Sequence, residues 1–238
     1  MPTILITALA DVGIAASGFV SPSLVVPGAA AALGGLAAGA VAVRCARRAF
    51  GVHVPHVAVA VACVGVALAL ALRLGSSVFL APLLVFGWAG VAISSIDLRT
   101  HLIPTRLLRV ATAVAVPLLC AAAVVDAGPA AALGTTGSAA VGGAGAWLIM
   151  HLVWMAARGG LGYGDVRLAG YLGLHLGLAG FTAVLTGLLA GFAIASATGV
   201  VGIVALGRET DHRFALGPSL VAGALAVIWW IGPTALGA

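Results

Sequence analysis

The sequence contains no lysine and few charged residues of any kind. Only 7% of its 238 residues are charged, made up of 11 arginines and 6 acids, whereas 63% are hydrophobic. A soluble globular domain carries about 25% charged residues. This composition therefore excludes a soluble globule and predicts a membrane protein that crosses the bilayer several times.

Cysteine is also scarce. Cys45, Cys63 and Cys120 lie far apart, form no Cys-x-x-Cys pair, and have no histidines near them at metal-ligand spacing. This pattern predicts neither a zinc site nor a disulfide framework. We therefore expect no metal and no cofactor. The net charge of +5 does not indicate a nucleic-acid partner either, because the arginines are scattered over several loops instead of forming one basic face.

Long apolar runs predict an all-α fold, a polytopic transmembrane helix bundle that forms a single domain over residues 1–238. A bilayer core of about 30 Å requires roughly 17 to 25 apolar residues in each helix. Six runs are close to this length or within it: 24–43, 57–72, 76–96, 107–125, about 138–157, and 214–231. The tract from 168 to 206 is too long for one crossing, and we divide it near Gly177 to Gly180, which makes eight spans. Residues 3–20 could form a ninth span or an interfacial helix, and we expect them to be retained because no basic segment precedes them.

The arginines orient this bundle, because loops on the cytoplasmic side carry the excess of basic residues. With the C-terminus of the first firm span inside, ten of the eleven arginines face the cytoplasm and only Arg73 lies outside. Asp97 and Asp165 then share the cytoplasmic face. We expect the helices to pack through small residues, with Gly35, Gly39, Gly187 and Gly191 as candidates.

Asp97 and Asp165 each lie where an apolar run meets water. Either one alone has a structural explanation, as a solvated cap or as the partner of an arginine. Together, two carboxyl groups on one face can share a proton and activate a water for attack on a peptide carbonyl, which is aspartic-protease chemistry. Helix dipoles favour an ionised Asp165 at a helix start and a protonated Asp97 at a helix end. Gly162 and Gly164 indicate a turn with unusual backbone geometry and a close approach to another group.

Three segments resemble the type IV prepilin peptidases, membrane aspartic proteases of the Gly-x-Gly-Asp type. Asp97 with Ile103-Pro104 is similar to the family's first aspartate motif, and Gly162-Tyr163-Gly164-Asp165 is similar to the second. Gly217-Pro218 resembles the family's Phe-Gly-Pro segment, although Leu216 replaces the usual phenylalanine. The resemblance covers about residues 76–231. It implies that Asp97 and Asp165 are catalytic and that the other motif residues support them.

The departures from the family pattern also carry information. Arg167 stands where lysine is usual, which keeps the charge but changes the donor geometry, so a role in aligning the two aspartates is one reading and simple orientation in the membrane is another. Larger family members carry a cytoplasmic insertion with paired cysteines and an N-methyltransferase activity that uses S-adenosylmethionine. The corresponding stretch here, 44–56, is short and lacks those pairs. We therefore expect a protease-only form, with methylation as the alternative.

The resemblance implies a multi-pass protein of the cell's inner or plasma membrane. Its expected partner is a pilin-like precursor with a short basic leader and a hydrophobic helix, cut at the cytoplasmic membrane boundary. Two other classes stay open, since intramembrane acids and broken helices also occur in transporters, and a scaffold could keep both aspartates without activity. The acids here lie at the boundary instead of the midplane, which favours the protease. The sequence leaves the oligomeric state open.

Overall fold

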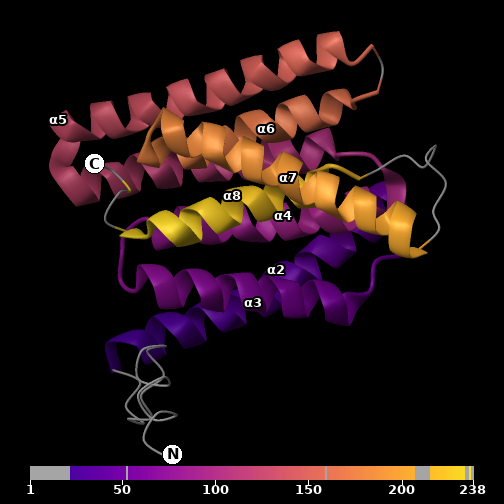
Figure 1. The fold of residues 1–238 in the computed structure, drawn as a ribbon. Helices are drawn as coiled ribbons and strands as arrows, with labels where there is room; N and C mark the ends of the chain where they lie inside the picture. Colours follow the sequence, from indigo (N-terminus) through magenta and orange to yellow (C-terminus); the bar gives the residue numbers. More distant parts are fainter. Residues whose placement is uncertain (1–21, 52, 159, 207–214, 234–235, 237–238) are drawn as a thin grey trace, which may run out of the picture.

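The fold is helical throughout the part of the chain that the structure, a computed structural model, describes: residues 22–51, 53–158, 160–206, 215–233 and 236. The elements are α2 (Pro22–Phe50), α3 (His56–Leu74), α4 (Leu80–Thr100), α5 (Thr105–Ala156), α6 (Tyr163–Leu176), the short 3-10 helix η1 (Gly177–Ala179), α7 (Phe181–Leu206) and α8 (Gly217–Ile231) (Figure 1). The predicted all-α class is confirmed.

Five of these helices are long and apolar enough to cross a membrane, namely α2, α3, α4, α5 and α7. The helices α6 and α8 have only 14 and 15 residues. The predicted count of eight spans is therefore not confirmed by helix length and composition. The candidate ninth segment, 3–20, lies outside the described residues.

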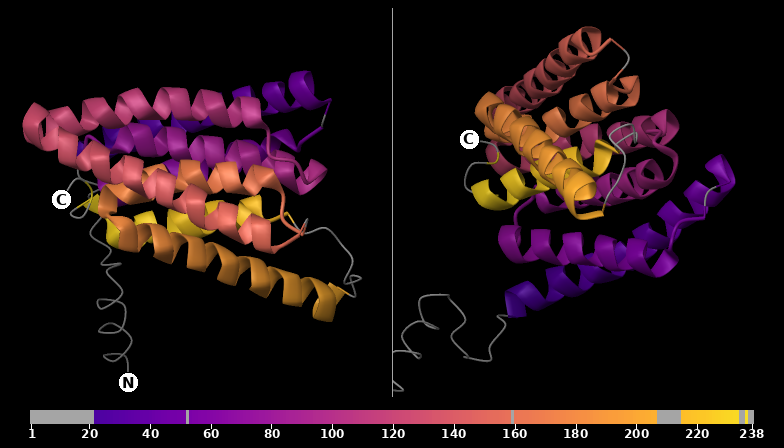
Figure 2. Two further views of the ribbon diagram at one scale, coloured as in Figure 1. Left: turned by 90° about the horizontal axis from the view of Figure 1, so that it is seen from above. Right: turned by 45° about the vertical axis from the view of Figure 1, so that its right-hand side comes forward.

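The element α5 is long because it consists of two helical halves that meet at an interruption. A straight helix of its 52 residues would measure about 78 Å at 1.5 Å per residue, well beyond the thickness of a bilayer core. Gly128 has φ 80° and ψ 168°, which is not helical, and Pro129 follows it. Figures 1 and 2 show that the two halves of α5 double back on each other there. We predicted two separate helices with a gap from 126 to 137, whereas the observed break is confined to Gly128.

The long apolar tract from 168 to 206 divides where the sequence predicted. The helix α6 ends at Leu176, η1 occupies the next three residues, and Gly180 adopts φ 89° before α7 begins. A positive φ strains every residue that has a Cβ, so Gly180 is well suited to this turn.

The first helix is longer than predicted. The predicted span ends at residue 43, but α2 continues to Phe50. Arg47 and Arg48 thus lie in the last turn of α2. There the negative end of the helix dipole stabilises the positive charge of an arginine, and the long side chain can also reach water. The helix α4 begins and ends about four residues later than the predicted span 76–96, which places Asp97 inside its last turn.

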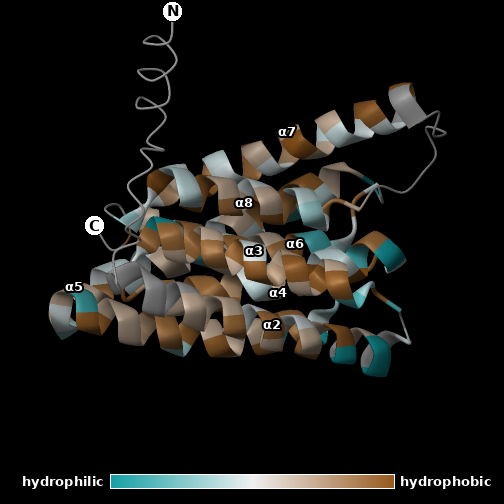
Figure 3. Cartoon of the chain, turned by 90° about the horizontal axis from the view of Figure 1, so that it is seen from below, coloured by the Kyte–Doolittle hydropathy of each residue, from teal (hydrophilic) through white to brown (hydrophobic). Residues whose placement is uncertain are grey.

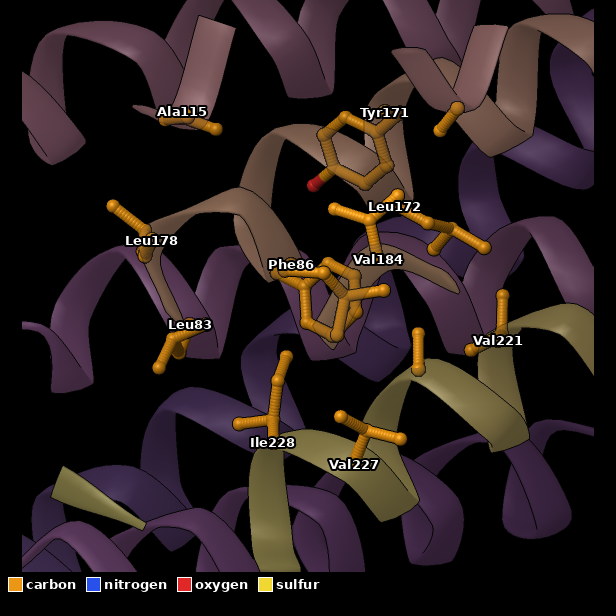
Figure 4. Packing of buried hydrophobic residues seen from close by; sticks show 14 of the residues in the cluster. Leu83, Phe86, Ala115, Tyr171, Leu172, Leu178, Val184, Val221, Val227 and Ile228 are labelled. Carbon is orange, nitrogen blue, oxygen red and sulfur yellow. The ribbon is translucent and has the colours of Figure 1, made fainter. Parts of the chain in front are cut away.

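The core lies between α4, α6 and α8, where Phe86, Leu172 and Ile228 are almost fully buried (Figure 4). Glycines allow two further helix pairs to pack closely, as predicted. A Cβ at Gly39 of α2 would lie 2.9 Å from Ala60 Cα of α3. A Cβ at Gly191 of α7 would lie 2.9 Å from the Cα of a leucine in α8. These contacts supply the van der Waals energy that holds helices together in a lipid environment.

Polar residues gather at one end of the bundle. The connections α2–α3, α4–α5 and α5–α6 lie at this end, which we call the basic end, and the hydrophilic turns in Figure 3 concentrate there. Eight arginines belong to these connections and the adjoining helix turns: Arg44, Arg47, Arg48, Arg99, Arg106, Arg109, Arg158 and Arg167. Arg73 lies at the opposite end, where its guanidinium donates to the carbonyl oxygens of Trp229 and Trp230 at 2.8 and 3.3 Å.

Candidate active site

Asp97 is held in place by the start of another helix. It lies in the last turn of α4 and is only 4% exposed. The backbone N–H of Gly217, the first residue of α8, donates to Asp97 Oδ2 at 3.0 Å. A Cβ at position 217 would stand 2.7 Å from that oxygen, closer than real Cβ atoms come. A side chain at position 217 would displace the carboxylate from this hydrogen bond, and the third predicted segment thus directly contacts the first aspartate.

Asp165 lies in the first turn of α6 and is partly buried. Burial and, to a smaller extent, the negative charge of Asp97 raise the pKa of its carboxyl group to about 7, and a hydrogen bond from the Gly162 backbone opposes both. Since the charge of Asp97 affects this pKa, the two carboxyl groups lie within electrostatic range of each other. The site thus brings together side chains from two helices that are 68 positions apart in the sequence.

The contacts of the pair favour a different location of the proton from the one that the helix dipoles predict. Helix dipoles favoured a protonated Asp97 and an ionised Asp165. In the structure, Asp97 accepts the Gly217 N–H, which stabilises its carboxylate. Burial and the Asp97 charge both favour the neutral form of Asp165. The hydrogen bond to Asp97 and the mutual repulsion therefore act against the helix dipoles and make Asp165 the candidate for the shared proton.

The two glycines before Asp165 serve close contacts and not unusual backbone angles. Gly162 caps α6 with φ −74° and ψ 137°, which any residue can adopt, and Gly164 is helical. The prediction of special backbone geometry is therefore wrong. The predicted close approach is confirmed: a Cβ at Gly164 would lie 2.9 Å from Ile103 Cβ, and one at Gly162 would lie 3.2 Å from Asp165 Oδ2.

The contact between Ile103 and Gly164 joins the two aspartate motifs. Ile103 packs against the start of α6, and the buried Pro104 caps α5 in an extended conformation. The side chain of Ile103 has room only because position 164 lacks a Cβ. This packing fixes the segment after Asp97 against the turn that carries Asp165.

Arg167 strengthens the same junction. Its Nη1 donates to Thr105 Oγ1 at 2.9 Å, and its guanidinium lies 4.9 Å from the centre of the Tyr163 ring. These contacts tie α6 to the first residue of α5. Through Thr105 and Tyr163, Arg167 contacts the turn that carries Asp165, and neither of these two contacts involves the carboxyl group of an aspartate.

Sequence reasoning missed the aromatic residues that surround Tyr163. The Trp154 ring meets it edge-on at 5.1 Å, and the His151 ring does so at 5.9 Å. His151 also stacks on Trp147 at 4.9 Å and on Trp154 at 5.5 Å. The spacing of these α5 residues, four and then three positions, places them on one helix face and was the available signal. The cluster holds the ring of Tyr163, and hence the residue next to Gly164.

Pro218 follows Gly217 in the first turn of α8, where proline is tolerated because its missing N–H has no helical partner to lose. Its side chain lines a mainly apolar cavity of about 430 Å³ between α3, α4 and α8. No cluster of three or more His, Cys, Asp or Glu side chains suited to a metal ion occurs among the described residues. Cys63 is buried and Cys120 is exposed.

These features define a class: a helical membrane protein that brings two aspartates from separate helices to the basic end of its bundle. The model of the type IV leader peptidase family matches residues 83–204, about half of the chain, and this range includes both aspartates. The chain belongs to that family and is a protease of the leader peptidase type. Gly217 and Pro218 lie beyond the matched range. Searches of curated proteins and of solved structures returned no match.

Proposed function

We propose that this protein is an aspartic endopeptidase that removes the short basic leader from type IV pilin-like precursors. Asp97 and Asp165 form its catalytic pair. The observation that carries the proposal is their electrostatic coupling at one end of the bundle, with Gly217 bonded to Asp97 and the Gly162 backbone bonded to Asp165. Leader peptidases cut peptide bonds, and a coupled pair of carboxyl groups is one established way to do so.

The chemistry follows from the location of the proton. The neutral Asp165 donates a hydrogen bond to the oxygen of the scissile carbonyl, and the Asp97 carboxylate takes a proton from the attacking water. A carbon–oxygen bond forms, and the carbonyl oxygen receives the proton of Asp165. Collapse of the tetrahedral intermediate breaks the carbon–nitrogen bond, and the proton held by Asp97 passes to the departing amine. Asp165 recovers its proton from the new carboxyl group.

The proposal includes a topology. With eight crossings, formed by α2, α3, α4, both halves of α5, α6 together with η1, α7 and α8, the basic end faces the cytoplasm. The eight described arginines at that end support this orientation. The protein then lies in the inner or plasma membrane, and a precursor helix in the bilayer presents its leader junction to Asp97 and Asp165.

The proposal is tested with membranes that contain the protein and a pilin-type precursor. Asp97→Asn and Asp165→Asn keep the shape of each side chain but remove the acid, and we expect each to reduce cleavage on the order of 10³-fold or more. Asp126→Asn is the matched control, because this exposed aspartate lies beside the break in α5, at the opposite end of the bundle. The control should cleave at the native rate.

Two results would overturn the mechanism or the function. Native-rate cleavage by either dyad variant excludes the carboxyl pair. Failure of the folded native protein to cleave any pilin-type precursor favours a transporter or scaffold. The mass of the mature N-terminus in the same samples tests the protease-only form, because methylation adds about 14 Da for each methyl group.

A further inference from the structure

A second cavity lies at the basic end, beside the aspartates but outside the proposed chemistry. Its volume is about 900 Å³, and it is lined by the N-terminal part of α5 and by Arg167 of α6. Ligand sites commonly enclose about 300 to 1,000 Å³. The cavity is therefore large enough for a ligand well beyond the size of a simple ion.

The lining changes character along α5. The first two turns contribute Thr105, Arg109 and Thr112, whereas the third turn contributes the apolar residues Ala113, Val116 and Pro117. From Thr105 to Pro117 the helix rises about 18 Å. The cavity is thus cationic where the bundle meets water and apolar toward the centre of the membrane, which is the polarity profile of one phospholipid molecule.

The cationic part contains two arginines, and one of them is preorganised. Arg167 is held by its hydrogen bond to Thr105 and by the Tyr163 ring, while Arg109 is exposed on the neighbouring helix. A planar guanidinium binds phosphate oxygens with two parallel hydrogen bonds and loses little entropy when it is already fixed. The basic leader expected for the precursor would be repelled by these arginines, so its charge does not suit this cavity.

We propose that the cavity binds an anionic phospholipid. The phosphate lies between Arg109 and Arg167, and an acyl chain lies along Leu108, Val116 and Pro117. Because Arg167 is two residues after Asp165 and contacts Thr105, the bound lipid also stabilises the junction between α5 and α6. Occupancy of the site therefore raises the thermal stability of the protein and its cleavage rate.

Lipid retention tests the site without any assay of proteolysis. The full-length protein is purified in mild detergent with equal amounts of phosphatidylglycerol and phosphatidylcholine, and bound lipid is measured by native mass spectrometry. We expect selective retention of phosphatidylglycerol. Arg109→Gln should weaken retention about five-fold, the effect of one arginine near an anionic headgroup. Val116→Trp, which fills the apolar part and leaves the charges unchanged, should also reduce it.

Arg106→Gln is the matched control, since Arg106 is exposed on the same helix and does not line the cavity. Equal retention of both lipids, or equal losses in the Arg106 and Arg109 variants, would overturn the proposal. Displacement of the lipid by millimolar inorganic phosphate would identify a free-anion site instead. Displacement by a pilin-type precursor would assign the cavity to the substrate. Selective retention by a protein without protease activity would leave the lipid site intact while the proposed function fails.

Discussion

Replacement of Gly217 by alanine tests how the structure supports Asp97. The backbone N–H of Gly217 donates to Asp97 Oδ2 at 3.0 Å. The new Cβ would lie 2.7 Å from that oxygen and 3.3 Å from Asp97 Cγ. Because real Cβ atoms do not approach so closely, the carboxylate must move away, and the hydrogen bond lengthens or breaks.

The size of the effect follows from this bond. A hydrogen bond to a charged group contributes about 1.5 to 3 kcal/mol. If the reaction depends on the full bond, each 1.36 kcal/mol changes the rate about ten-fold. Gly217→Ala should therefore lower kcat by about 10-fold to 150-fold. KM should change little, because the substitution alters the position of the carboxylate and not the surface that receives the precursor.

The assay compares cleavage kinetics and thermal unfolding in the same detergent. Gly65→Ala is the control, because a Cβ there would meet nothing within 4 Å and should leave kcat unchanged. A Gly217→Ala protein that unfolds normally and retains kcat within about two-fold of the native value would refute the role assigned to this bond. A rise in KM at constant kcat would instead assign Gly217 to substrate binding.

Three further predictions concern the junction around Asp165. Gly164→Ala places a Cβ 2.9 Å from Ile103 Cβ and should lower the cleavage activity. Adding Ile103→Ala should restore part of that activity, with a coupling energy of about 0.5 to 3 kcal/mol in a double-mutant cycle. Additive effects of the two substitutions would contradict the contact. Burial, and to a smaller extent the Asp97 charge, raises the pKa of Asp165 to about 7. Above that pH the pair loses its shared proton, and kcat should fall about ten-fold for each pH unit. A kcat that rises above pH 7 would exclude Asp165 as the acid. Arg167→Lys keeps the charge but loses the planar stack on Tyr163, and we expect several-fold lower activity together with a lower unfolding temperature; native values of both would show that charge alone suffices.

The helices were largely predictable because a bilayer imposes a length on each apolar run. The tract from 168 to 206 exceeded that length and contained glycines where the observed turn occurs. The break in α5 was harder to place. The predicted spans 107–125 and about 138–157 left a gap from Asp126 onward, yet Gly134 and Gly137 in this gap lie within the helix that begins after Gly128. In a membrane, continuous backbone hydrogen bonding outweighs the weak helix propensity of glycine, so one positive φ was sufficient for the reversal.

The candidate site was predictable as a set of residues but not as a set of contacts. The ends of the apolar runs identified Asp97 and Asp165, and the resemblance to the prepilin peptidases identified Gly217. The hydrogen bond between Gly217 and Asp97 joins positions 120 residues apart, and local sequence contains no information about such a pairing. The contacts that bear on the location of the shared proton are non-local for the same reason. Helix dipoles can be estimated from sequence, whereas the Gly217 N–H and the burial of each carboxyl depend on how separate helices pack.

The three glycines of the site show why one residue type recurs in these motifs. Gly162 leaves space for the carboxyl group of Asp165, Gly164 leaves space for Ile103, and Gly217 leaves space for Asp97. None of the three has a positive φ, so alanine could adopt each backbone conformation, and the effect of alanine at these positions would be steric. Each missing Cβ faces an aspartate or the segment that follows one. The glycines thus bring three chain segments close enough to couple two carboxyl groups, and the loss of any one should disturb the pair more than it destabilises the fold.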